Sequence, residues 1–372
     1  MGSLAVAAST PIAGSGAAVT RMSLRDALEL GPEIWDPLLA LSESASPFSG
    51  WAWHHAWSLA AEPRQVDARE VLLVRGPDGA PQAILPLALS RIRWRRMLTP
   101  ALTWATGDDG CPDHLDLLAA PGADLDALAA AVEALPWHVA VFENVADPSP
   151  NLDRLSQALG RRGLAVRRAP LWACPRLALP DSWETYLASL SSGRRQALRR
   201  KERGLYRDHA ATLTDYSPER LEEGFGHLVR LHQERWGGAG AFVDPRAARL
   251  QLEFAREMAK RRRLWLTTLD CQGEPAAAWY GFSSHDSVYF YQSGRALRWE
   301  NESVGQVLMG IMIRRAIEQG YRWFDFLRGE DPYKTHWTGA RRSTRELVVF
   351  RSGWRGGWLR ALDFLAEHRL HA

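Results

Sequence analysis

The chain has 372 residues, of which 46% are hydrophobic and 24% are charged, and its formal net charge is +3. This length is typical of two domains of ordinary size, and the composition is that of a soluble globular protein. The small net charge does not by itself indicate nucleic acid or a membrane as a partner. Seventeen tryptophans predict aromatic cores or aromatic-lined clefts.

The cysteines and the N-terminus bear on where the protein acts. Cys111, Cys174 and Cys271 lie far apart, which excludes a CxxC metal or redox motif and is typical of a reducing cytoplasm. No stretch approaches the roughly 20 apolar residues of a membrane span. Residues 1–20 lack the basic region of a signal peptide. We therefore expect a cytoplasmic protein without a membrane span and with a disordered tail at residues 1–20.

Residues 34–61 have helical spacing, and Pro47 and Gly50 divide them into two pieces. The second piece contains His54 and His55. Adjacent residues do not share a helix face, so a two-histidine metal site is disfavoured and we interpret the segment as a Trp-rich core helix.

Residues 97–119 are interpreted as strand, loop and strand. The loop concentrates acidic residues and one histidine, namely Asp108, Asp109, Asp113, His114 and Asp116. Such a loop can bind a divalent metal, line a substrate cleft or form a solvated turn. We expect no metal, and we take Asp113 and His114 as substrate-binding candidates.

The remaining elements give an α/β order. Helices are predicted at residues 122–135 and 151–162, and a Pro-rich crossing at 169–181 leads into the second half. There, seven of the 14 residues from Arg194 to Arg207 are basic. This run is either a solvated helix face or a helix that contacts the phosphates of an anionic cofactor or RNA.

Two hairpin signals divide the chain into similar halves. The turn DGAP (78–81) and the turn QGEP (272–275) each join two apolar strands, about 194 residues apart. Because this offset is close to half of the chain, we infer an internal duplication.

The stretch from Ser303 to Trp337 concentrates the reactive side chains. Ser303 and Gln306 have the spacing of a capping box before an apolar helix, which Gly320 ends. The first-turn amides of that helix have no partner within the helix, and its dipole is positive at that end, so it predicts an anion-binding site. Gly305 has no side chain to keep a pyrophosphate from the backbone. The strand at 322–327 follows. Its Asp325 is expected to be either ion-paired, with Arg328 or Lys334, or part of a site.

Polar residues after this strand lie where α/β folds bind ligands. Acyl transfer to an amine needs a base, an oxyanion donor and an acid. Glu330, Asp325 or His336 can serve as the base, a backbone amide of residues 288–292 as the oxyanion donor, and Tyr333 as the acid.

The order of these elements resembles the cofactor-binding core of a GNAT acyltransferase. More specifically it is similar to the CelD/BcsL-type acetyltransferases, which carry a DF-x-x-G-x-x-x-YK-x-x-W pattern. The matching residues are Asp325, Phe326, Gly329, Tyr333, Lys334 and Trp337. The segments LHQERW (231–236) and PFSGWAWHHAW (47–57) and the basic helix also look like this family, and the resemblance covers roughly residues 30–350.

The resemblance implies two tandem GNAT-like domains, as in the FemABX aminoacyl transferases, each with a mostly antiparallel sheet flanked by helices. The domains are expected at residues 21–170 and 171–355, with a C-terminal helix at 356–372. One departure concerns the pyrophosphate loop, [QR]-x-x-G-x-[GA]. The segment NESVGQ supplies one glycine, and Asn301 stands at the leading position.

The leading hypothesis is an N-acyltransferase that moves an acetyl or longer acyl group from acyl-CoA to an amine of a small metabolite or sugar. An aminoacyl-tRNA-dependent transferase, with tRNA as a partner, is the alternative, and a non-catalytic protein of polysaccharide assembly is the third. The sequence does not give the oligomeric state. The catalytic candidates are Tyr333, Asp325, Glu330, Lys334 and His336. The cofactor-binding candidates are Ser303, Val304, Gly305, Gln306, Gln292 and Arg328. The substrate-binding candidates are Trp236, Trp337, Asp113 and His114.

Overall fold

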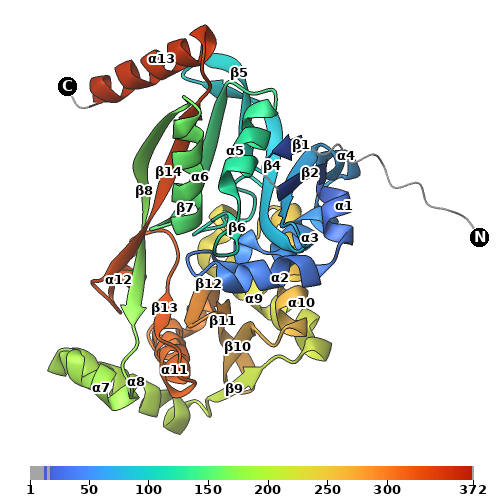
Figure 1. Ribbon diagram of the computed structural model, residues 1–372. Helices are drawn as coiled ribbons and strands as arrows, with labels where there is room; N and C mark the ends of the chain where they lie inside the picture. The colour runs from blue at the N-terminus through green and yellow to red at the C-terminus, as the bar shows by residue number, and fades with distance from the viewer. Residues whose placement is uncertain (1–11, 15–16, 371–372) are drawn as a thin grey trace, which may run out of the picture. The chain divides into compact units, whose positions relative to one another are not determined.

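The computed structural model describes residues 12–14 and 17–370 (Figure 1). The chain divides into two compact units. Unit 1 comprises residues 1–172 and 343–372, and unit 2 comprises residues 173–342. The expected linear boundaries differ from this division, because the chain returns to unit 1 after Arg342. Of the expected tail, residues 1–11 and 15–16 lie outside the described residues, whereas Ala17–Ser23 forms a strand.

Unit 1 contains a mixed sheet. Its strand order is β1-β2-β3-β4-β5-β7-β14-β8, with β6 beside β4. The pairs from β1 to β5, the pair of β4 and β6 and the pair of β7 and β14 are antiparallel, whereas β5 and β7 pair in parallel. The strands are β1 (Ile12–Gly14), β2 (Ala17–Ser23), β3 (Arg69–Arg75), β4 (Pro81–Trp94), β5 (Met97–Trp104), β6 (Leu118–Ala119), β7 (Val139–Asp147), β8 (Ala165–Ala178) and β14 (Arg341–Phe350).

The helices of unit 1 bury aromatic residues. The helices are α1 (Leu24–Glu29), α2 (Pro32–Leu41), α3 (Trp51–Ala60), α4 (Pro63–Asp67), α5 (Leu125–Ala134), α6 (Pro150–Arg161) and α13 (Trp354–Leu370). Helix α3 buries Trp53 and Trp57, so the predicted Trp-rich core helix is confirmed.

Unit 2 has its own mixed sheet, in the order β8-β13-β12-β11-β10-β9. Strands β12 and β13 pair in parallel, and the other neighbours pair in antiparallel fashion. The added strands are β9 (Thr212–Asp215), β10 (Leu264–Cys271), β11 (Glu274–Ser284), β12 (Ser287–Arg295) and β13 (Trp323–Asp325). The helices are α7 (Trp183–Ser189), α8 (Ser192–Asp208), α9 (Leu221–Trp236), α10 (Pro245–Lys260), α11 (Val304–Glu318) and α12 (Pro332–Thr335).

The two units repeat one order of elements. In unit 1 the hairpin β3–β4 is followed by β5, α5 and β7, and in unit 2 the hairpin β10–β11 is followed by β12, α11 and β13. In each unit the helix connects two strands that pair in parallel, namely β5 and β7 in unit 1 and β12 and β13 in unit 2. Parallel neighbours need such a crossover connection. The expected mixed α/β class is confirmed, and the repeated order supports the inferred duplication.

Helix α11 positions the site in unit 2. Its residues are apolar on most sides, and Val304, Val307, Leu308 and Met312 are buried in the core that it forms with β11 and β12. The helix ends at Glu318, and Gly320 follows with a φ of +78°, as predicted for a glycine that stops a helix. None of the helices described here is both long and apolar enough to cross a bilayer.

Candidate active site

The parallel strands β12 and β13 separate at one end. Their pairing stops at Tyr289 and Asp325, but β12 continues to Arg295. A bulge lies within this continuation, because Gln292 and Phe290 pair with consecutive residues of β11 and Tyr291 between them has no register partner. A bulge re-aims side chains and interrupts the ladder of backbone hydrogen bonds. The sheet therefore opens beside residues 290–295.

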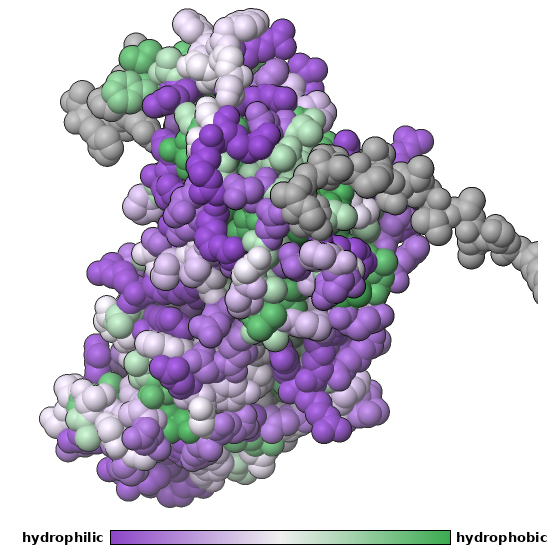
Figure 2. Space-filling view, in the orientation of Figure 1, coloured by the Kyte–Doolittle hydropathy of each residue, from purple (hydrophilic) through white to green (hydrophobic). Residues whose placement is uncertain are grey.

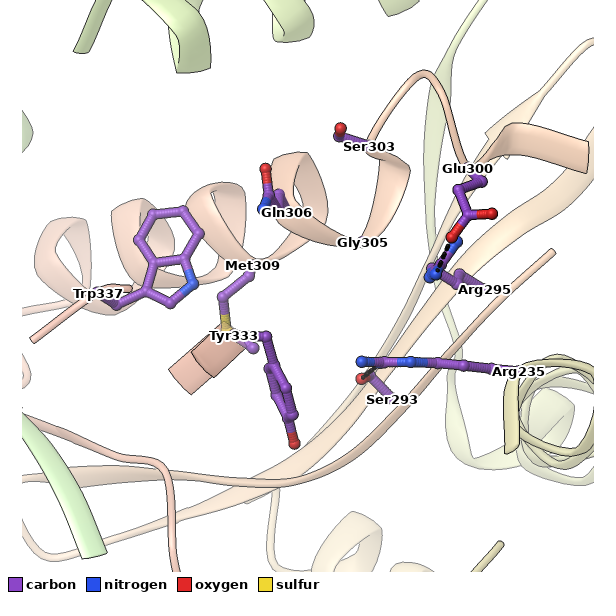
Figure 3. Close-up of a pocket in the computed structure, with 10 residues that line it drawn as sticks. All are labelled: Arg235, Ser293, Arg295, Glu300, Ser303, Gly305, Gln306, Met309, Tyr333 and Trp337. Carbon is purple, nitrogen blue, oxygen red and sulfur yellow. Dashed lines mark hydrogen bonds and ion pairs between the residues drawn. The ribbon is translucent and has the colours of Figure 1, made fainter. Parts of the chain in front are cut away.

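A pocket of about 230 Å³ lies at this opening (Figure 3). It is formed by the end of α9, the continuation of β12, the first turns of α11 and the segment that contains α12. The lining residues are Arg235, Ser293, Arg295, Glu300, Ser303, Gly305, Gln306, Met309, Tyr333 and Trp337. The structure thus brings together five of the predicted site residues, namely Ser303, Gly305, Gln306, Tyr333 and Trp337.

The start of α11 has no side-chain cap. Ser303 adopts a left-handed backbone conformation with a φ of 57°, and its side chain makes no capping hydrogen bond. The predicted capping box is therefore wrong, because a capping serine needs an extended backbone. Instead, the Nζ of Lys201 on α8 donates to the Oγ of Ser303 at 2.6 Å and lies 3.5 Å from the Oε1 of Gln306.

An ammonium group thus stands at the positive end of the α11 dipole. Charge repulsion disfavours this placement unless an anion binds there. Lys201 is also the point at which the basic helix α8 reaches the pocket. Of the two alternatives for that helix, contact with an anionic ligand is the one that this geometry favours. Val304 itself is fully buried, so only its backbone can contribute to such a seat.

Two arginines line the pocket. The guanidinium of Arg235 lies over the Tyr333 ring, 5.0 Å from the ring centre, and donates to the Oγ of Ser293 at 3.3 Å. Burial lowers the pKa of Arg235 below its usual value, which still leaves an arginine charged at neutral pH. Arg295 pairs with Glu300 at 2.7 Å.

Tyr333 is the one phenol that lines the pocket (Figure 3). Burial raises the pKa of Tyr333 to about 12, with Asp331 acting in the same direction and Arg235 opposing both. Its ring packs edge-on against Phe290. The hydroxyl therefore keeps its proton at neutral pH and can donate it.

Asp325 and Lys334 do not line this pocket. Asp325 is 1% exposed, accepts a hydrogen bond from the Leu327 amide at 2.8 Å and lies 3.9 Å from the Nε of Arg176. Of the two alternatives predicted for Asp325, ion pairing is the one observed, and Arg176 is a partner. The Nζ of buried Lys334 donates to the carbonyl of Arg328 and lies 3.8 Å from Asp331. These contacts stabilise the conformation of the loop after β13.

Two further candidates, Glu330 and His336, are not among the residues that line the pocket. Glu330 is exposed and pairs with Arg341 at 2.7 Å. His336 precedes Trp337, and burial, followed by the charges of Arg194 and Lys201, lowers the pKa of His336. The His336 ring is therefore neutral at pH 7 and able to accept a proton.

Gln292 and Trp236 adjoin residues that do line the pocket. Gln292 is next to Ser293, and successive strand residues face opposite sides of a sheet. Trp236 is 41% exposed and stacks on Arg235, with 4.6 Å between the guanidinium carbon and the ring centre.

Asp113 and His114 belong to unit 1 and are 1% and 0% exposed. Ser46 donates through its hydroxyl to the Asp113 carbonyl and through its amide to the His114 carbonyl. The nearby Asp116 is also buried and accepts hydrogen bonds from Ser149 and from the Leu117 amide. These three residues are buried and hydrogen-bonded within unit 1, so they do not form a solvated turn, and substrate binding by Asp113 and His114 stays a prediction. No group of three or more metal-ligating side chains occurs among the residues that the structure describes.

Sequence reasoning missed Lys201, Arg235, Ser293 and Arg295. Two of them lie in segments that the sequence analysis had singled out. The segment 231–236 contains Arg235, and the strand SVYFYQSG contains Ser293. The bulge at Tyr291 shifts the alternation of that strand, and a sequence pattern does not reveal it.

Comparison with known proteins agrees with this geometry. Residues 192–335 match the model of the acetyltransferase (GNAT) domain family. A GNAT acetyltransferase domain thus spans most of unit 2, and the expected GNAT resemblance is confirmed there. Among curated proteins, none matches the chain significantly in sequence.

Solved structures share the fold over most of the chain at low identity. FemX is 11% identical with a TM-score of 0.56, over 87% of this chain and 96% of its own. L-PGS from Bacillus licheniformis is 12% identical with a TM-score of 0.52, over 91% and 96%. The C-terminal domain assigned to a lysylphosphatidylglycerol synthetase of Agrobacterium fabrum is 12% identical with a TM-score of 0.53, over 91% and 95%.

Proposed function

We propose that unit 2 is an N-acyltransferase that takes an acyl group from acyl-CoA and transfers it to an amine. One observation carries this proposal. The uncapped start of α11 faces the opening between β12 and β13 and has Lys201 beside it. This place combines free backbone amides, the positive end of a helix dipole and an ammonium group, which together favour binding of a diphosphate. Acyl-CoA carries a diphosphate.

The proposed reaction uses Tyr333, which lines the pocket, and His336, which precedes the lining residue Trp337. The amine nitrogen attacks the thioester carbonyl, so a C–N bond forms and the C–S bond breaks. In this proposal a backbone amide of the bulged β12 segment stabilises the oxyanion. Tyr333 then gives its proton to the departing thiolate, while a base takes the proton from the ammonium. His336, neutral at pH 7, is the base that we favour over Asp325 and Glu330, which are held in ion pairs.

The repeated order of elements supports assigning this role to unit 2. In unit 1 the helix that corresponds to α11 is α5. Its first-turn amide at Ala127 donates to the Asp124 side chain at 2.9 Å. A carboxylate therefore already caps α5 and would repel a phosphate. The start of α11 carries a cation instead.

Transfer from aminoacyl-tRNA is a second candidate. The basic helix α8 and the fold shared with FemX favour it. We also keep the CelD/BcsL-type resemblance as a proposal about the finer family. A non-catalytic protein is the third candidate, and it requires a pocket that binds ligand without turnover.

Turnover assays distinguish these functions. Purified protein is incubated with acetyl-CoA and a panel of amines, including amino sugars, and released CoA is detected with a thiol reagent. Acyl-CoA turnover that survives RNase treatment supports the proposal. Activity that requires charged tRNA and disappears with RNase would replace it with the second candidate.

A further inference from the structure

Helix α13 is fixed to unit 1 by one of its faces. Leu359 on this face is 3% exposed and packs in a small core with Trp94 and Phe350. Asp363, one turn further on, is buried and pairs with Arg95 at 2.8 Å and with Arg167 at 2.6 Å. The orientation of the helix about its own axis is therefore set.

The opposite face of α13 is apolar and exposed. At 100° per residue, Trp354, Trp358 and Leu365 lie within about 40° of one another and about 140–180° from Asp363. They are 79%, 57% and 55% exposed. Exposed tryptophans aligned in this way are uncommon on a surface that faces only water, because each leaves a large apolar area in contact with solvent.

The turn between β4 and β5 extends this apolar stripe. Met97 and Leu98 are 42% and 60% exposed, and they follow a two-residue turn in which Arg95 and Arg96 have φ values of 44° and 71°. The ion pair between Arg95 and Asp363 holds the turn beside α13 (Figure 1).

This surface is also basic. In Figure 2, pale and green residues lie along the part of the surface where Figure 1 places α13, with purple residues between them. Within residues 91–98 and 354–366, whose side chains the structure describes, the only carboxylate is Asp363, and it is buried in its ion pairs. Besides Arg95, which pairs with Asp363, the exposed basic residues in these segments are Arg91, Arg93, Arg96, Arg355 and Arg360.

We propose that the outer face of α13 and the β4–β5 turn dock on the surface of an anionic lipid bilayer. Trp side chains favour the boundary between headgroups and acyl chains, and arginines beside them attract anionic headgroups. A second copy of the chain fits this surface less well, because a two-fold contact would bring the same arginines together. The proposal is independent of the acyl-transfer reaction, since α13 belongs to unit 1.

Vesicle co-sedimentation tests this inference on the full chain. The probes are vesicles of phosphatidylcholine alone and vesicles with 30% phosphatidylglycerol. We expect binding to the anionic vesicles, weakened at least tenfold between about 0.05 and 0.5 M salt. The double variant Trp354→Ser/Trp358→Ser should bind at least tenfold more weakly, and Arg355→Gln/Arg360→Gln should show a weaker salt dependence than the wild type. Trp172→Ser, at a residue that is 46% exposed elsewhere, is the matched control and should bind as the wild type does.

Three outcomes would overturn the proposal. The first is an absence of binding to anionic vesicles at low salt. The second is equal binding by wild type and the tryptophan double variant, with thermal unfolding showing both to be folded. The third is a dimer in analytical ultracentrifugation that the double variant abolishes without any binding to vesicles, which would make this face an interface between copies of the chain.

Discussion

Tyr333 is the residue on which the proposed chemistry depends most. Its hydroxyl is the protonated donor in the pocket, and its ring is held between Phe290 and Arg235. Tyr333→Phe removes the proton and keeps the packing. We expect kcat to fall by about 100-fold or more with little change in KM, because general acid catalysis contributes about 10²–10⁴-fold. Unchanged kcat in steady-state assays would remove Tyr333 from the mechanism.

Lys201 is the residue that distinguishes a cofactor seat from an ordinary helix start. Lys201→Ala should raise the Kd for CoA roughly 10- to 100-fold, because a charged hydrogen bond contributes about 1.5–3 kcal/mol. The matched control is Lys260→Ala, at an exposed lysine on α10 that pairs with Glu257. Calorimetry measures both. Equal losses in the two variants would show that Lys201 contributes only general charge.

His54 makes the stability of the protein depend on pH. The side chain is buried against Trp35, and burial lowers the pKa of His54 to about 4. Between pH 6.5 and pH 4 the unfolded chain therefore binds a proton that the folded protein does not. Stability is lost as the pH falls through this window, by about 3 kcal/mol at its lower end.

Urea unfolding at pH 7 and pH 4.5 tests this expectation. His54→Gln should reduce the loss of unfolding free energy between the two pH values, and His55→Gln, at the neighbouring position, should not. The same pH dependence in the wild type and in His54→Gln would assign the acid sensitivity to another group.

At the scale of elements, α9 lies unusually close to β12. A Cβ added at Gly294 would lie 2.4 Å from the amide nitrogen of His232 on α9. Gly294→Ala should therefore move α9, together with Arg235, away from the pocket. We expect it to destabilise the protein by about 1–3 kcal/mol and to raise KM.

A glycine on the same helix provides the control. A Cβ at Gly226 meets no atom within 4 Å. Gly226→Ala should leave KM unchanged and stabilise α9 by up to about 1 kcal/mol, because alanine has the higher helix propensity. Equal thermal stability of the two variants would contradict the close packing of α9 on β12.

Elements with strong local signals could be predicted from the sequence. The two hairpins, the Trp-rich α3 and the stop at Gly320 depend on apolar periodicity and turn residues within a few positions. The helix start at Ser303 could not, because the Lys201 contact joins residues 102 positions apart. A serine with a lysine bound to its hydroxyl has the same local sequence as a capping serine.

At the scale of the whole chain, β14 differs most from the expected domain boundaries. We expected it in the second domain, at residues 171–355, but residues from 343 onward belong to unit 1. Its strand pattern is ordinary, but its residues 343–350 pair with β7 of unit 1, after unit 2 has been completed. Local patterns do not specify which strand of the chain will be a partner. They therefore give a linear pair of domains, whereas the fold returns to the first.

This return predicts the effect of a truncation. A chain that ends at Arg342 lacks the strand beside β7. The backbone groups at the edge of β7 are then exposed, and exposed strand edges promote aggregation. We expect the truncated protein to unfold at a lower temperature and to form aggregates in size-exclusion chromatography. A monomeric truncated protein with the melting temperature of the full chain would show that β14 contributes little.

The most direct test of the central proposal is calorimetric titration of the folded, full-length protein with acetyl-CoA. The account predicts one binding site per chain and tenfold or greater weakening in Lys201→Ala, but not in Lys260→Ala. No binding heat from wild-type protein at millimolar acetyl-CoA, or equal binding by wild type and Lys201→Ala, would contradict it.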